Sequence, residues 1–179
     1  MTRLALVFMM LLPAAALADD EGSEHTAQLV GDSADTIGVT VTFDDAAGWS
    51  MSVRAKPGDA LKTFQIAMPK RHAHYVVYVT PKRSAIAFVE VSAGIETGRD
   101  KVGAKDQIAW VWSPTDGKLV RSWTYGQLFT PAELGNLRRS VSHAAWHSGH
   151  AVTKAGLELK VDGAKPRTIV LDAKATTLR

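Results

Sequence analysis

The 179-residue chain contains no cysteine. Without a thiol it has neither a disulfide framework nor the cysteine that a bacterial lipid anchor needs, so we expect its stability to come from a hydrophobic core. Glycine and proline number only 14 and 7, while 46% of the residues are hydrophobic. These proportions exclude collagen-like and low-complexity chains and are typical of an ordinary globular protein.

Long apolar runs are also missing. The longest one, Leu4–Leu12, would span roughly 13 Å as a helix, less than half the thickness of a membrane core. It follows Arg3 and leads into small residues that end at Ala18, which is the pattern of a secretory signal peptide. We therefore expect a cleaved leader over residues 1–18, no membrane span after cleavage, and a periplasmic or secreted location.

Charge is unevenly distributed, although the net charge is only +3. Residues 19–53 hold eight acids and no Lys or Arg, whereas residues 54–179 hold 20 bases and 10 acids. Two interpretations stay open: an acidic N-terminal layer that packs on a basic body, or a basic face for an anionic polymer such as lipopolysaccharide, a cell-wall polyanion or nucleic acid. The bases occur in pairs rather than in runs of five or more, which argues against the polymer-binding face, and nucleic acid is not an expected partner.

The chain divides at about residue 36. Residues 19–35 are polar and acidic, so we expect a frayed segment with one short strand near Ala27–Val30. Residues 36–179 form a single β-rich domain in this interpretation. Apolar residues are nearly continuous over Tyr75–Val79 and Ala85–Val91, which indicates central strands buried on both faces.

Alternation of apolar and polar residues predicts most of the remaining strands. Hairpins are expected where two alternating segments flank a turn: 37–43 with 49–53, 108–112 with 119–124, and 157–161 with 168–172. The glycine-rich segment 92–105 is expected to be the longest loop. Thr130-Pro131-Ala132-Glu133 predicts one short helix of about two turns, with Phe129 packed on Leu134 and Arg138 and Arg139 at its end.

Together these segments predict an all-β protein: a single antiparallel β-sandwich, open barrel or propeller fragment of about ten strands with one short helix.

Part of the C-terminal half has a recognisable pattern. Gly117–Arg121 is followed by Leu128–Leu134, then by Arg139–His143 and Trp146. This resembles a group of uncharacterised exported bacterial proteins in which a blade-like hairpin precedes a short helix and a Ser-Val-Ser strand with a nearby Trp. The stretch Val79–Phe88 also resembles the turn and strand of a propeller blade, except that Lys82-Arg83 replaces the usual Asp-Gly. The resemblance implies no activity and no catalytic residue.

Five of the six histidines are candidates for a metal site. His72 and His74 lie two residues apart at the start of a strand, so both would face one side, and His143, His147 and His150 fall within eight residues. Neutral imidazoles suit zinc and copper. In a regular strand, however, the odd spacing would turn His150 away from the face of His147.

Patterns for catalysis are weak. Ser140 and Ser142 neighbour His143, but no Gly-x-Ser-x-Gly turn and no phosphate-binding loop occurs. Glu90 is the one acid in an apolar strand and so the one expected to be partly buried. A single carboxylate does not make a glycosidase.

The five tryptophans favour a core role over carbohydrate stacking, although Trp123 alternates with Arg121 and is expected on a wetter face. We interpret the chain as an exported, non-enzymatic scaffold or binding domain without a cofactor. Its loops would contact an envelope or extracellular partner, either a protein or a glycan. The alternative is a histidine-based zinc or copper binding protein.

Overall fold

The computed structural model describes residues 25–54, 56, 58–69, 73–94, 102–139, 143–162 and 166–179. The expected leader over residues 1–18 lies outside these ranges, as do residues 95–101 of the expected long loop. All statements below concern the described residues.

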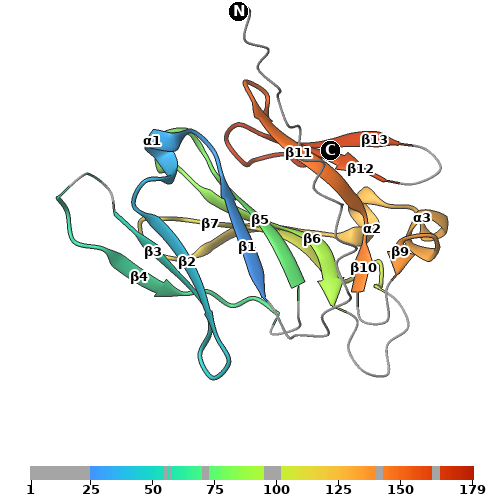
Figure 1. Cartoon of the computed structure of the whole chain (residues 1–179), viewed down its shortest axis with the longest axis horizontal. Coiled ribbons are helices and arrows are strands. Elements are labelled where there is room, and N and C mark those ends of the chain that lie inside the picture. Colours follow the sequence, from blue (N-terminus) through green and yellow to red (C-terminus); the bar gives the residue numbers. More distant parts are fainter. Residues whose placement is uncertain are drawn as a thin grey trace, which may run out of the picture.

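A seven-stranded central sheet forms the middle of the molecule (Figure 1). Its strands are β1 (Thr26–Val30), β5 (Ala73–Val79), β6 (Ile86–Gly94), β7 (Gln107–Trp112), β8 (Leu119–Thr124), β9 (Arg138–Arg139) and β10 (His143–Ala145). The first half of β6 lies between β5 and β7, and its last residues pair with β10. Residues 92–94, which were expected to begin a loop, therefore extend this strand. β1 pairs parallel to β5, so the sheet is not purely antiparallel.

Two smaller antiparallel sheets complete the fold (Figure 1). The first contains β2 (Val39–Asp44), β3 (Gly48–Val53) and β4 (Lys62–Gln65), and the second contains β11 (His147–Thr153), β12 (Gly156–Val161) and β13 (Arg167–Asp172). The three hairpins predicted from alternation are confirmed, with Phe43 opposite Trp49 in the first of them.

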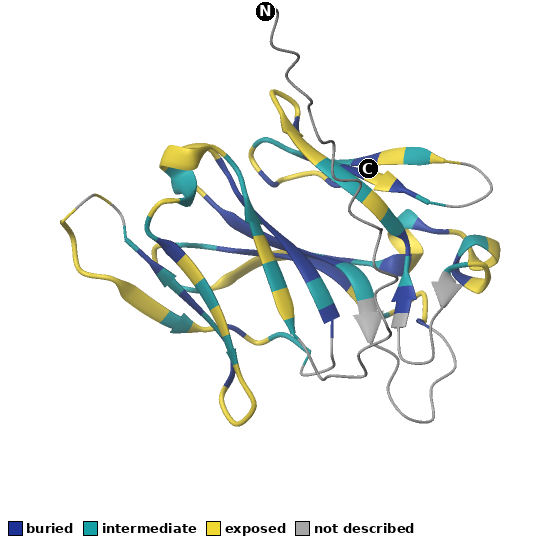
Figure 2. Cartoon of the chain, viewed as in Figure 1, coloured by how far each residue is buried: buried dark blue, intermediate teal, exposed yellow. Residues whose placement is uncertain are grey.

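The two small sheets supply the outer layers of two separate hydrophobic cores. Trp49 and Met51 of β3 share one core with Val77 of β5, whereas Leu159 of β12 shares the other core with Val76. Neighbouring residues of a strand point to opposite faces, so a central strand with a core on each side must be apolar at almost every position. Figure 2 shows the central strands as largely buried. The prediction of central strands over 75–79 and 85–91 is confirmed, and the sandwich has three layers of sheet.

The helices are short: α1 (Ser33–Thr36), α2 (Tyr125–Leu128), α3 (Pro131–Gly135) and the 3-10 helix η1 (Pro81–Arg83). Only α3 was predicted, and it is shorter than the two turns expected. Its capping box is present, because the backbone N–H of Glu133 donates to Oγ1 of Thr130 and the N–H of Thr130 donates to Oε2 of Glu133. Arg138 and Arg139 do not end this helix but form β9.

All five tryptophans are buried. Trp123 is therefore not on a wetter face as expected: it is 9% exposed, and the guanidinium of Arg121 lies 5.9 Å from its ring centroid. None of the five indoles offers an open ring face for stacking. No helix in the described ranges has the length and hydropathy needed to cross a membrane.

Candidate functional site

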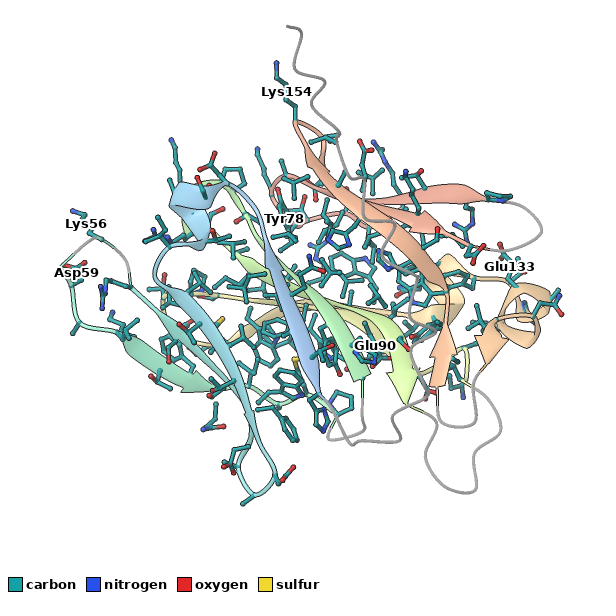
Figure 3. The ribbon with its side chains drawn as sticks, viewed as in Figure 1. Lys56, Asp59, Tyr78, Glu90, Glu133 and Lys154 are labelled. Carbon is teal, nitrogen blue, oxygen red and sulfur yellow. The ribbon has the colours of Figure 1, made fainter. Side chains whose placement is uncertain are left out.

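A pocket of about 520 Å³ opens where three loops of the sandwich meet. It is lined by Val53, Asp59, Ala60, Lys62, Lys82, Arg83, Pro114 and Thr115. These residues come from the end of β3, the β3–β4 connection and the start of β4, from the η1 turn between β5 and β6, and from the turn between β7 and β8. Figure 3 shows Lys56 and Asp59 of the β3–β4 connection at one end of the molecule, far from Glu133 at the other end. Loops rather than sheet faces therefore form most of this cationic pocket.

The charged lining consists of three bases and one acid. Lys62 and Lys82 are exposed, and neither forms an ion pair with a described carboxylate. Asp59 uses Oδ2 to accept the backbone N–H of Lys56 at 3.1 Å, so this oxygen stabilises its own loop. The pocket therefore carries a net positive charge.

The η1 turn holds its two basic residues in an unusual backbone conformation. Lys82 has φ +60° and Arg83 has φ +53°, the left-handed region that non-glycine residues avoid at a cost of roughly 1–2 kcal/mol each. The N–H of Arg83 donates to the carbonyl of Thr80 at 2.9 Å, which places Lys82 at the turn position where glycine is usual. Such strain persists only where surrounding contacts fix the backbone.

Those contacts come from α1 and the end of β3. Nε of Arg83 donates to the carbonyl of Asp35 at 2.9 Å, and its two terminal nitrogens donate to the carbonyls of Arg54 and Ala34 at 2.6 Å. The backbone N–H of Lys82 donates to Oδ1 of Asp35 at 2.9 Å. The acidic N-terminal segment thus contacts the basic body here, and its contacts fix the backbone of the turn from which the exposed Lys82 side chain extends.

The turn between β7 and β8 forms another wall of the pocket. Gly117 has φ +67°, and a Cβ at this position would lie 2.5 Å from the ring of Phe64 on β4. The absence of a side chain lets the turn pack closely against β4. Pro114 and Thr115 of the same turn line the pocket beside Lys62.

The structure brings together two of the five candidate metal ligands. Nε2 of His147 lies 3.3 Å from Nδ1 of His150. His74 is on β5 and hydrogen-bonds through Nδ1 to the hydroxyl of Thr26. His72 lies outside the described residues, as does the side chain of His143. Among the described side chains, no three His, Cys, Asp or Glu residues form a cluster that could hold a metal.

The expectation that His150 faces away from His147 is wrong, and the reason is a β-bulge. His147 is opposite Val161 and Gly149 is opposite Lys160, so β11 has one residue more than β12 between these pairs. The extra residue shifts the alternation by one position. His150 is opposite Leu159, which faces the same core as Val161, and the two histidines therefore share a face.

Glu90 is more deeply buried than expected, with no exposed surface. Its Oε1 accepts a 2.9 Å hydrogen bond from the hydroxyl of Tyr125, and its Oε2 accepts one of 3.4 Å from Tyr75. The indole N–H of Trp146 donates to the backbone carbonyl of Glu90 at 2.8 Å. Figure 3 shows Glu90 within the packed interior. These bonds join α2 and the segment before β11 to the central strand β6.

Sequence reasoning did not find the cationic pocket, because its residues come from three segments far apart in the chain. One signal was present, namely the Lys82-Arg83 pair where Asp-Gly is usual. Ser140 and Ser142 lie outside the described residues. No protein-family model, curated protein or solved structure matches the chain.

Proposed function

We propose that the protein is an exported, non-enzymatic binding domain whose cationic pocket takes an oxyanion group, a phosphate or a carboxylate, of an anionic envelope polymer. Export is supported by the leader pattern of residues 1–18. The polymer is the interpretation of the basic surface that the charge distribution left open. The cationic pocket supports this interpretation, because it gathers three bases and one acid.

The main observation behind this proposal is the pair Lys62 and Lys82. Both side chains line the pocket, and neither forms an ion pair with a carboxylate among the residues that the structure describes. An ammonium group is a compact charge with three donors, which suits phosphate and carboxylate oxygens. Arg83 has its guanidinium donors on backbone carbonyls and adds positive charge without needing to move. The two lysines are then the groups that contact the ligand.

The fixed turn supports the same function. The backbone of Lys82 is held in a strained conformation by Asp35 rather than placed on a relaxed surface loop. A fixed backbone lowers the ordering cost of binding to that of the lysine side chain alone. All five indoles are buried, so charge rather than aromatic stacking is what the described surface offers to a glycan.

The test uses inorganic pyrophosphate and citrate as probes for the two oxyanion classes. We expect either probe to shift the backbone amide resonances of Ala60 and Thr115 in ¹H–¹⁵N spectra of the protein at low salt. The double variant Lys62→Gln/Lys82→Gln should weaken binding about tenfold, because both ammonium groups are lost.

A matched control removes the same charge elsewhere. Lys154, in the turn between β11 and β12, and Lys174, in the turn after β13, are exposed, and Lys154 lies far from Lys56 and Asp59 in Figure 3. The double variant Lys154→Gln/Lys174→Gln should bind both probes as the unmodified protein does. Equal weakening in both double variants, or no binding of either probe, would overturn the proposal.

A further inference from the structure

The bulged strand β11 carries a second site that is independent of the cationic pocket. Nε2 of His147 and Nδ1 of His150 are 3.3 Å apart, and their ring centroids are 5.2 Å apart. We propose that this histidine pair binds a zinc ion, with water at the remaining coordination positions.

The spacing of the two nitrogens fits a tetrahedral ion. Two nitrogens that each lie 2.0–2.1 Å from one zinc ion are about 3.3 Å apart at the tetrahedral angle, and the centroids of their rings are then about 5 Å apart. A square-planar ion would need the nitrogens at about 2.9 Å. The same spacing also allows one ring to donate a hydrogen bond to the other, so zinc would replace a shared proton.

The pair is built by the strand rather than by chance proximity of surface loops. The bulge after His147 brings a residue at odd spacing onto the same face. His147 packs edge-on against the buried Trp146, with 5.9 Å between their ring centroids. Because this packing limits the motion of the first ring, the pair is partly preorganised for a ligand.

Access and protonation also suit a metal. Both histidines are half-buried, and β11 is the outer strand of its sheet in the described structure, so solvent reaches the pair. Burial and the neighbouring His150 lower the pKa of His147 below its usual value. Zinc binds the neutral ring, so a lowered pKa reduces competition from protons near pH 7.

The test is titration of the protein with zinc chloride, followed by calorimetry and by ¹⁵N spectra of the imidazole rings. We expect one ion per chain and shifts of Nε2 of His147 and Nδ1 of His150. Each of His147→Asn and His150→Asn should weaken binding about tenfold or more. The matched variant His74→Asn, on β5, should bind zinc as the unmodified protein does.

The ring spectra need no variant, so the assignment can be tested even if one substitution disturbs the fold. If the protein binds no zinc when the zinc concentration reaches about 0.1 mM, the proposal is overturned. Zinc binding that persists in both variants, or that shifts other ring nitrogens instead, would overturn it too.

Discussion

The hydroxyl of Tyr125 donates a 2.9 Å hydrogen bond to Oε1 of Glu90, a side chain with no exposed surface. Tyr75 donates to the other oxygen over 3.4 Å. Loss of a donor to a buried acceptor costs about 1–3 kcal/mol, and the shorter bond is the stronger one. We expect Tyr125→Phe to lower the free energy of unfolding by this amount and Tyr75→Phe by less, as measured by urea unfolding at pH 7. A larger loss for Tyr75→Phe would contradict the ranking.

Gly156, the first residue of β12, has φ +132°, and a Cβ there would lie 2.0 Å from the carbonyl oxygen of Leu171. Gly156→Ala would force β12 away from β13, so we expect it to destabilise the protein by about 3 kcal/mol or more. Gly135 in α3 is the matched control, because a Cβ there meets no atom within 4 Å. Gly135→Ala should stabilise the protein by up to about 1 kcal/mol. The assignment of Gly156 as the sterically restricted glycine would be contradicted if thermal melts showed equal shifts of the melting temperature for the two variants, or a larger loss for Gly135→Ala.

The capping box of α3 links a helix end to the ionisation of Glu133. Hydrogen bonds from the backbone and side chain of Thr130, with a smaller effect of Arg167, hold the pKa of Glu133 below its usual value. Thr130→Ala removes the side-chain bonds and should lower the free energy of unfolding by about 1 kcal/mol. It should also raise the pKa of Glu133 toward its usual value, measured by NMR titration. An unchanged pKa would mean that the side chain of Thr130 does not stabilise the carboxylate.

Stability should depend on pH through His147. Burial, and then the charge of His150, lower its pKa in the folded state, so between the folded and unfolded pKa values the unfolded chain binds more protons. The contribution of His147 is therefore fully present above about pH 6.5, the unfolded value, and is lost as pH falls through the folded pKa. Urea unfolding from pH 8 to 5 should show a smaller loss in His147→Gln than in the unmodified protein. Parallel curves would contradict it.

Lys82 connects stability with the proposed binding function. Lys82→Gly should raise the free energy of unfolding by up to about 1 kcal/mol, because glycine adopts φ +60° without the cost borne by lysine. The same variant should bind pyrophosphate more weakly. Lys82→Gln keeps the backbone strain and loses only the charge, so it should weaken binding without the gain in stability.

Much of the fold could be predicted, because its signals are local. Alternation fixes the faces of β2, β3 and β12 directly, and continuous apolar runs identified β5 and β6 as central. In β7 a register shift places Ile108 and Trp110 in different cores, although alternation puts them on one face. The extension of β6 to Gly94 could not be predicted, since its partner β10 lies about fifty residues later in the chain. The burial of Trp123 could not be predicted from its neighbour Arg121, because Arg121 lies over the indole ring while the indole belongs to the core that includes Leu159.

The candidate sites were harder to predict for two physical reasons. The cationic pocket depends on how three loops meet, and no local pattern encodes that meeting. The histidine pair depends on one extra residue in β11, which reverses the faces of every later position. Gly149, a lone glycine within that strand, was the available sign of a bulge.

The placement of the central strands between two cores has a consequence for cooperativity. Val76 and Val77 are adjacent on β5 but belong to different cores, so unfolding of either small sheet would expose the apolar side chains on one face of the central sheet to water. Unfolding of one small sheet therefore costs the apolar area buried on both sides of its core. The three sheets should therefore unfold in a single transition, in which damage to one core weakens both.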